Sequence, residues 1–238
     1  MPDPKTLQVI AENLDQMRVG LDGTFLFECR GCGKCCKNRE DILLNPRDLF
    51  RIAQHLYLKP EEVVERYCEK YAGESSRLPL VRLYPRGEER ACPFLLNRRC
   101  RVHQAKPSVC ALFPLGRYMK ASKADPGAPP EIGYFVWPAT CGRPVQTTVR
   151  SYLESFGFPV EDAFYRKWSE TIIELSTFIR EAEQKGIPRS GISAVQTLMY
   201  VFLYLKYDLT QDFLPQFISN ADSLREKLRD VRAKFLGG

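Results

Sequence analysis

Long apolar runs are missing from the sequence. The stretch LMYVFLYL at residues 198–205 is far shorter than the roughly 20 apolar residues that a membrane-spanning helix needs, and Lys206 and Asp208 follow it closely. The N-terminal stretch MPDPKTLQVIAENLDQMRVG is polar and contains no apolar segment of the kind found in secretory signals. These absences predict a soluble protein of the cytoplasm, without membrane contact.

Motifs of the common nucleotide-binding and hydrolytic enzymes are missing as well. The sequence has no G-x-G-x-x-G or Walker-type glycine loop, no H-E-x-x-H helix and no Ser/His/Asp arrangement. It contains only two histidines, and it has no internal repeat and no low-complexity tract. These absences leave enzymatic activity open and direct attention to cysteine, which is abundant.

The composition is that of an ordinary globular protein. Of the 238 residues, 44% are hydrophobic and 27% are charged, so the chain can bury a core without the help of disulfides. The net charge is +6, and the isoelectric point is near 8.8. Because the basic residues are not concentrated in one helix or stripe, a solvated surface explains this charge better than a nucleic-acid interface, which is the alternative.

Nine cysteines stand out, and four of them fall within the stretch FECRGCGKCCKNRE at residues 27–40. In the reducing cytoplasm, clustered thiols indicate metal binding rather than disulfides. Cys68 is separate from the others and falls on the apolar face of an expected helix, where a thiol packs well. Eight cysteines remain, which is twice the number of thiolates that complete a tetrahedral zinc site or a [4Fe–4S] cluster.

The cysteine spacing favours iron–sulfur over zinc. Cys29, Cys32 and Cys35 have the C-x2-C-x2-C spacing with which three thiolates bind different irons of one [4Fe–4S] cluster in bacterial ferredoxins. A single zinc usually takes a C-x2-C pair from each of two segments, and no second segment here carries one. Cys92, which precedes a proline, is the favoured fourth ligand, and Cys36 would bind a second metal with three of the other cysteines. Spacing alone leaves zinc open as the alternative.

Basic residues are interspersed among the cysteines. No acidic residue lies between positions 29 and 39, and residues 82–106 hold seven Arg or Lys against two acids. Such cations would offset the negative charge of a thiolate-bound cluster, although they could equally serve to solubilise the loops. His103 follows Cys100 by three residues. With eight thiols available, we expect it to donate a hydrogen bond beside the metal rather than to bind it.

Helical periodicity dominates the chain outside the cysteine segments. Asn45 followed by Pro46 is typical of a helix start, and TFLFE and LVRLY are short candidate strands. We therefore expect a mainly α-helical protein, with an irregular cysteine-rich metal-binding core at residues 1–150 and a helical extension at residues 151–238 packed on it. Helices are expected within residues 5–18, 45–58, 60–71, 161–185, 195–203 and 221–235.

Four pieces of the sequence carry a resemblance to a known family: CRGCGKCC, LNPRDLFRIAQHL, CPFLLNRRCRVHQAKPSVCALFPLGR and the cysteine at 141. Together they cover roughly residues 25–142, and they resemble the YkgJ-like CxxCxxCC cysteine-cluster family, described as zinc- or iron-chelating. The family includes flagellin lysine N-methylases, which look like iron–sulfur-dependent methyltransferases. His103 departs from the tyrosine expected there. The metal ligands that the resemblance implies are Cys29, Cys32, Cys35, Cys36, Cys92, Cys100, Cys110 and Cys141.

Three functional hypotheses follow from these residues and this resemblance. We favour a metal-binding protein that carries one or two iron–sulfur clusters on the eight cysteines, in a redox or cluster-dependent role that serves a protein partner. The second hypothesis is an iron–sulfur-dependent methyltransferase with a protein substrate. The third is a zinc-stabilised interaction module that contacts nucleic acid through its arginines. Because Pro- and Gly-rich loops offer little core, we expect loss of metal to unfold residues 25–142.

Overall fold

The computed structural model describes residues 12–38, 42–120, 130–138 and 141–235. Contacts between residues divide the chain into two compact units. The first, here called the cysteine unit, comprises the chain up to Leu43 together with Leu83–Arg166. The second, the helical unit, comprises Leu44–Arg82 together with the chain from Lys167 onward. Each unit is therefore built from two segments that are distant in sequence. The predicted limit near residue 150, as a boundary between independently folding domains, stays a prediction.

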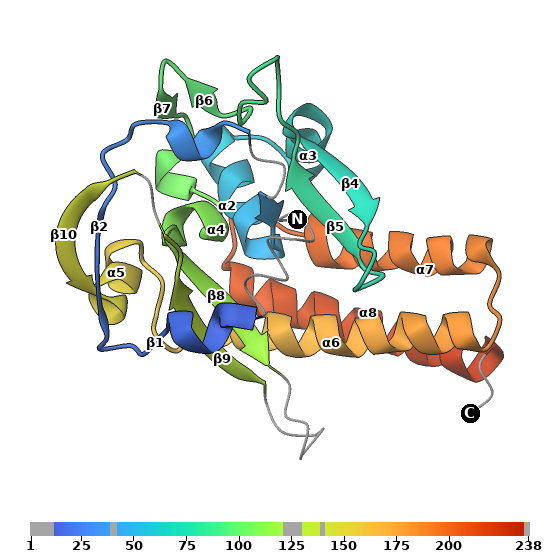
Figure 1. Cartoon of the computed structure of the whole chain (residues 1–238). Helices are drawn as coiled ribbons and strands as arrows, with labels where there is room; N and C mark the ends of the chain where they lie inside the picture. The colour runs from blue at the N-terminus through green and yellow to red at the C-terminus, as the bar shows by residue number, and fades with distance from the viewer. Residues whose placement is uncertain (1–11, 39–41, 121–129, 139–140, 236–238) are drawn as a thin grey trace. The chain divides into compact units, whose positions relative to one another are not determined.

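The fold is mixed α/β, so the expectation of a mainly α-helical protein with a helical extension is wrong. The structure is 50% helical and 21% strand, and its strands form several small sheets (Figure 1). These strands are short, and some of them pair with partners that are distant in the chain. The pairing of Arg18 with Phe135 is one example. Contacts with the neighbouring strand stabilise such strands. Their own sequences therefore need not show the alternation of apolar and polar residues by which a strand is recognised.

The cysteine unit consists mainly of short strands and loops. Residues 12–17, at its described N-terminal end, are helical, and the rest of the helix expected at 5–18 lies outside the described residues. The further elements are β1 (Arg18–Val19), β2 (Thr24–Glu28), η1 (Lys34–Cys36), β6 (Leu95–Leu96), β7 (Arg99–Cys100), η2 (His103–Ala105), α4 (Ser108–Leu112), β8 (Leu115–Lys120), β9 (Glu131–Val136), β10 (Arg143–Thr148) and α5 (Val149–Ser155).

Four antiparallel pairings join these strands into three small sheets. β9 lies between β1 and β8 in one sheet, β2 pairs with β10, and β6 pairs with β7 in a hairpin. The expected strand TFLFE is confirmed as β2, in which Phe25 and Phe27 are buried and the residues between and beside them are exposed. This alternation sends both rings to one side of the β2–β10 pair.

An aromatic core lies beneath the β2–β10 pair. The Tyr152 ring of α5 meets the rings of Phe25 and Phe27 edge-on at centroid distances of 5.2 and 6.3 Å, and its hydroxyl donates a 2.6 Å hydrogen bond to the carbonyl of Phe113. Cys141 packs against the border of this core. The cysteine unit thus has buried apolar contacts of its own, in addition to anything that a metal supplies. The buried residues of the cluster are Phe25, Phe27, Ala111, Leu112, Leu115, Tyr134, Val149, Tyr152, Leu153 and Phe158.

The helical unit places its long helices beside a small sheet with the strand order β3-β5-β4. The sequence locates its helix starts well, since Asn45 and Asp48 cap α2 reciprocally, with N···O distances of 2.9 and 3.3 Å. Pro46 is the first residue of α2, and Pro60 is the first of α3. The elements are β3 (Leu43–Leu44), α2 (Pro46–Leu56), α3 (Pro60–Tyr67), β4 (Cys68–Ala72), β5 (Pro79–Leu83), α6 (Ala163–Gln184), α7 (Arg189–Tyr200), the π-helical turn η3 (Val201–Leu205) and α8 (Phe213–Phe235).

The core of the helical unit is formed by the apolar faces that the helical periodicity predicts. Leu49 and Ile52 of α2, Leu175 of α6, Met199 of α7 and Leu224 of α8 are each at most 1% exposed. No helix in the described part of the chain is long and apolar enough to cross a membrane.

Gly116 is expected to be intolerant of a side chain. It lies opposite Phe135 in the β8–β9 register, and a Cβ atom placed on it would collide with the buried Phe135 ring. We expect Gly116→Ala to lower the free energy of unfolding by about 1–3 kcal/mol, because the ring has little room to move. Denaturant unfolding measures the change. Gly20→Ala is the matched control, because a Cβ there meets nothing within 4 Å. Equal stability of the two variants would contradict the expectation.

Candidate metal centre

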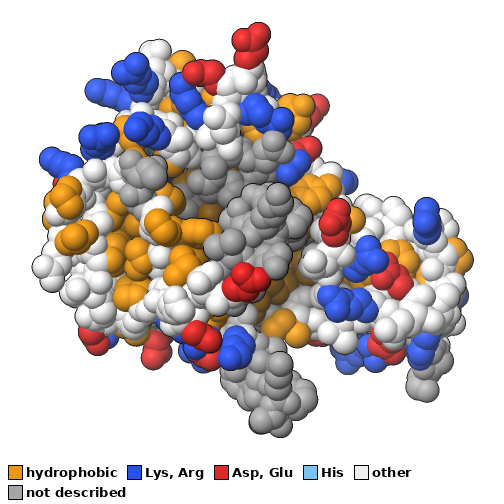
Figure 2. Space-filling view, viewed as in Figure 1, with side chains coloured by type: hydrophobic (Ala, Val, Ile, Leu, Met, Phe, Trp, Pro, Cys, Tyr) orange, Lys and Arg blue, Asp and Glu red, His pale blue; other side chains and the backbone are white. Residues whose placement is uncertain are grey.

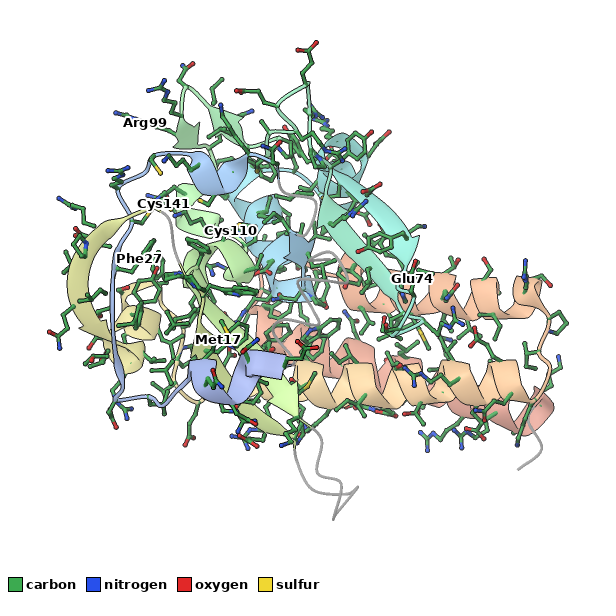
Figure 3. The ribbon with its side chains drawn as sticks, in the orientation of Figure 1. Met17, Phe27, Glu74, Arg99, Cys110 and Cys141 are labelled. Atoms are coloured by element: carbon green, nitrogen blue, oxygen red, sulfur yellow. The ribbon has the colours of Figure 1, made fainter. Side chains whose placement is uncertain are left out.

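The cysteines expected to bind metal all belong to the cysteine unit, and Cys68 belongs to the helical unit. Figure 3 labels Cys110 on α4 and Cys141 just before β10, on the same side of the unit as the loop that follows β2. Main-chain geometry explains how segments so far apart in sequence bring their thiols into one region.

The loop after β2 carries Cys29, Cys32, Cys35 and Cys36. Gly31 and Gly33 have φ values of 64° and 71°, in the left-handed region that glycine enters at little cost. These two glycines turn the chain between successive cysteines, and η1 then closes with a hydrogen bond from the Cys36 N–H to the Gly33 carbonyl (3.1 Å). These two glycines therefore give the loop its tight turns.

Cys92 and Cys100 reach this loop through main-chain hydrogen bonds. The N–H of Cys92 donates to the carbonyl of Cys36 at 2.8 Å, and the N–H of Leu95 donates to the carbonyl of Cys92 at 2.9 Å. Leu95 in turn pairs with Cys100 across the β6–β7 hairpin. Cys36, Cys92 and Cys100 are thus brought together by the backbone, independently of any metal.

Cys141 reaches the opposite part of the same loop. In the antiparallel pairing of β10 with β2, Arg143 lies opposite Glu28. The register can be continued by two residues before Arg143 and two residues after Glu28. Cys141 then lies beside the segment that begins with Cys29. The Cys141 thiol also interacts with that of Cys32, which agrees with this register.

The thiols lie close enough to oppose one another's ionisation. A hydrogen bond with Cys35, then burial, and then the negative charges of Cys35, Cys92 and Cys110 raise the pKa of Cys36. Burial first, and the charges of Cys100 and Cys35 with it, raise the pKa of Cys92 to about 11. Each thiolate makes the ionisation of a neighbouring thiol less favourable. A bound cation reverses this effect because it stabilises the thiolate form.

The pKa of Cys141 follows the same pattern with different neighbours. Burial raises it first, and the negative charges of Cys32, Cys35 and Cys29 add to the shift. The pKa of Cys32 is instead lowered, mainly by a backbone hydrogen bond from Lys34 and partly by the Arg30 side chain. The two ends of the first cysteine loop therefore have different thiol partners.

The donor set suits a thiophilic metal or an iron–sulfur cluster. Eight soft sulfur donors surround one region, which is the chemistry that Zn²⁺ and iron–sulfur clusters require. Among the described residues, however, no group of three or more His, Cys, Asp or Glu side chains converges tightly enough to hold one ion as placed. The thiols must turn toward the metal when it binds, so metal binding and side-chain order are coupled.

The role expected of His103, a hydrogen-bond donor beside the metal, stays a prediction, and the structure corrects the expectation for Cys68. His103 is exposed at the start of η2, and desolvation followed by the charge of Lys106 lowers its pKa. The expectation that Cys68 lies on a helix face is wrong, because α3 ends at Tyr67 and Cys68–Ala72 form β4. The pairing of β4 with β5, which is not visible in the local periodicity, ends the helix.

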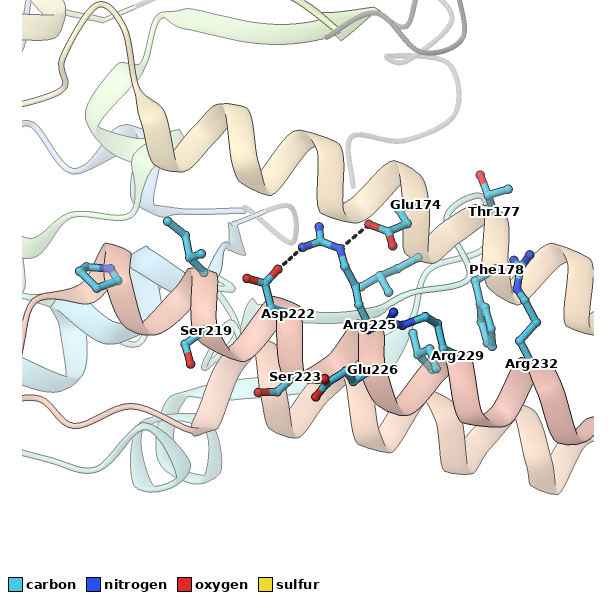
Figure 4. Close-up of a pocket in the computed structure, with 14 residues that line it drawn as sticks. Glu174, Thr177, Phe178, Ser219, Asp222, Ser223, Arg225, Glu226, Arg229 and Arg232 are labelled. Atoms are coloured by element: carbon cyan, nitrogen blue, oxygen red, sulfur yellow. Dashed lines mark hydrogen bonds and ion pairs between the residues drawn. The ribbon is translucent and has the colours of Figure 1, made fainter.

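A cavity of about 1160 Å³ lies between α6 and α8 within the helical unit (Figure 4). Arg225 crosses it, pairing with Glu174 (2.8 Å) and Asp222 (2.7 Å). Serine, glutamate and arginine side chains make up much of its lining, and no cysteine contributes to it. No pattern in the sequence indicates this cavity, because its two walls come from helices about 50 residues apart.

Comparisons with known proteins agree with the cysteine motifs. Residues 28–132 match the family described as "CxxCxxCC: Putative zinc- or iron-chelating domain". An uncharacterized protein of Methanocaldococcus jannaschii is 26% identical over 113 residues, which are 47% of this chain and 53% of that protein. The chain thus matches about half the length of that curated relative, and no solved structure matches the chain. The expected resemblance is confirmed for residues 28–132, and Cys141 lies beyond the matched segment.

The separate position of Cys68 leads to a prediction. Cys68→Ala should leave the metal content of the purified protein unchanged and lower the free energy of unfolding by about 1 kcal/mol, since it removes only a half-buried thiol from β4. Elemental analysis and thermal unfolding measure the two effects. Cys92→Ala is the comparison variant and should lose metal. A Cys68→Ala protein that had lost metal would show that the odd cysteine is wrongly assigned.

Proposed function

We propose that the chain is an iron–sulfur protein of the cytoplasm, whose eight clustered cysteines hold two metal centres in a redox or cluster-dependent role. The observation that carries the proposal is the position of all eight cysteines in one unit, in which main-chain contacts bring Cys92, Cys100 and Cys141 to the first cysteine loop. The match of residues 28–132 to a zinc- or iron-chelating family supports the metal, and the C-x2-C-x2-C spacing supports iron–sulfur over zinc.

The main-chain contacts support a division of the cysteines into two sets. In the first set, Cys141 lies with Cys29, Cys32 and Cys35, which the β2–β10 register brings together. This assignment replaces Cys92, favoured from the sequence, as the fourth ligand of the C-x2-C-x2-C cluster. The reason is that Cys92 is hydrogen-bonded through its backbone to Cys36, which faces the other set.

The second set consists of the cysteines around the β6–β7 hairpin. Cys36, Cys92 and Cys100 are linked by the main chain, and Cys110 on α4 interacts electrostatically with Cys36. Four thiolates complete either a [4Fe–4S] cluster or a structural zinc site. The proposal assigns adjacent Cys35 and Cys36 to different sets, and the Cys35 thiol, which also interacts with those of Cys36 and Cys92, lies where the two sets meet.

Both sets favour electron transfer or structural support over substrate chemistry. A centre with four thiolates has no open position at which a substrate could bind. When bound, an iron–sulfur cluster would supply one-electron redox chemistry. The chain's own contribution is to orient the thiols and to place Arg30 and Lys34 beside them, where positive charge stabilises an anionic centre. A protein partner that receives or donates the electron is part of this proposal.

The nature of the metal is the first test. Protein purified without oxygen should contain about four irons and four sulfides per chain, or about eight of each, with the brown colour of a [4Fe–4S] protein. Iron, zinc and acid-labile sulfide are measured on the same sample. One cluster plus one zinc also agrees with two sets of four thiolates. Zinc as the sole metal, without sulfide, would refute the iron–sulfur assignment.

The division into two sets is tested with single substitutions. Cys141→Ser should abolish the centre of the first set while the second keeps its metal, and Cys92→Ser should have the converse effect. Electron paramagnetic resonance of the reduced proteins, together with metal analysis, distinguishes the two centres. Cys68→Ser is the matched control. The assignment fails if Cys92→Ser and Cys29→Ser remove the same centre while Cys141→Ser leaves it intact.

The buried aromatic core changes what metal removal should do. The sequence led us to expect unfolding of residues 25–142, but the β8–β9 pair and the aromatic cluster are stabilised by apolar burial. We expect chelation to expose the amides of residues 29–38 and 91–101 to hydrogen exchange, while Leu115–Lys120 stays protected. Exchange followed by mass spectrometry checks this. Simultaneous loss of protection in both regions would show that the metal holds the whole unit.

A further inference from the structure

The turn of the β6–β7 hairpin contains an arginine where glycine is the usual choice. Asn97 and Arg98 connect the two strands, and their φ values are 49° and 62°. A two-residue turn with both φ values positive is typically Asn-Gly, because a side chain on the second residue is sterically unfavourable in the left-handed region. The chain therefore keeps Arg98 at a conformational cost that glycine would avoid, a cost that it also accepts at Arg77 and Arg90.

The side chains at this turn carry positive charge that the described part of the chain does not neutralise. Arg98 and Arg99 are exposed, and neither has a carboxylate partner among the described residues. The preceding loop carries two exposed acids, of which Glu89 is paired with Lys37 at 2.7 Å and Glu88 forms no ion pair with Arg98 or Arg99 among the described residues. Figure 2 shows Lys and Arg side chains gathered on this face, over β6 and β7.

The first cysteine loop adds to the same basic face. A Cβ atom on Gly33 would lie 3.6 Å from the Arg98 carbonyl oxygen and 3.5 Å from the side chain of Leu95, so this loop packs directly against the hairpin. The loop carries the exposed residues Arg30 and Lys34. The tertiary structure thus joins cations that are about 65 residues apart in sequence, and the sequence argument against a basic patch does not hold for the folded chain.

We propose that this face, centred on Arg98 and Arg99, binds the phosphate backbone of a nucleic acid. Arginine presents a fork of N–H donors that matches phosphate oxygens, and a hollow of about 510 Å³ beside Arg99 is also lined by Arg101. A protein partner would require an apolar centre in the interface, whereas phosphate binding needs little more than positive charge. Among the hairpin's own residues Leu95–Cys100, the large apolar side chain that is exposed is Leu96, at 56%, which is too little to form the apolar centre of a protein interface.

This inference is independent of which metal the cysteines bind. The hairpin includes Cys100, so a bound metal would hold the basic face in place, but zinc and iron–sulfur would do so equally. Binding of nucleic acid and metal content are separate measurements, and failure of either proposal is therefore visible without the other.

Arg98→Gly is the sharpest test, because it removes the charge while it gives the turn its preferred Asn-Gly sequence. Arg77→Gly is the matched control: Arg77 also has a positive φ (62°), belongs to the helical unit and is likewise a single arginine lost to glycine. Metal-loaded full-length proteins are titrated into a labelled mixed-sequence DNA, single-stranded and duplex, over a range of salt concentrations. Poly-glutamate is titrated in parallel as an acidic polypeptide.

The expected result is salt-dependent binding of DNA by the unmodified protein. Arg98→Gly should weaken it several-fold and reduce the slope of log affinity against log salt by about 0.7 to 0.9, the value for one lost phosphate contact. The thermal stability of Arg98→Gly should equal or exceed that of the unmodified protein. Arg77→Gly should bind DNA as tightly as the unmodified protein does. Arg99→Gln should weaken DNA binding in the same way as Arg98→Gly. If Arg98→Gly changes the metal content, the Arg99→Gln variant tests the proposal in its place. Absence of DNA binding, equal weakening by Arg77→Gly, or equally tight binding of poly-glutamate would overturn the proposal.

Discussion

Two sets of main-chain contacts bring the cysteines together, and the rest of the cysteine unit is arranged around them. The hydrogen bond from Cys92 to Cys36 fixes the second cysteine segment against the first, and the pairing of Arg143 with Glu28 brings in Cys141. Both contacts use backbone groups, so they do not depend on the side chains that a metal would engage. These main-chain contacts bring the cysteine segments together, and a metal bound by the thiols would add to the order of the loops that carry them.

Crowded thiols are unfavourable without a cation, and the unit compensates for this. Burial and neighbouring charges raise the pKa values of Cys36, Cys92 and Cys141, so these groups stay neutral thiols in the absence of metal. Basic residues around them favour the charged form once a centre is bound. The aromatic core around Tyr152 supplies stability that does not depend on this balance.

The basic face follows from the same arrangement. Gly33 allows the first cysteine loop to lie against the β6–β7 turn, and this contact places Arg30 and Lys34 in the same region as Arg98. Residues that hold a metal and residues that carry unneutralised charge therefore lie on the same loops. If the metal orders these loops, it also orders the surface that we propose for nucleic acid.

The sequence by itself determined the features that depend on neighbouring residues. These are the metal-binding character of the CRGCGKCC segment, the caps at Asn45 and Pro46, the long helices of the helical unit and the separate status of Cys68. Capping, helical periodicity and ligand spacing all act within a few residues, so they can be recognised in the sequence.

Only the tertiary structure decided the mixed α/β fold, the strand that carries Cys68 and the proximity of Cys141 to Cys29. It also joined the arginines of two distant loops. Each of these depends on pairing with another segment of the chain, from β5, which follows β4 closely, to β10, which lies more than a hundred residues from β2. Such pairing is stabilised by partners that local periodicity cannot reveal.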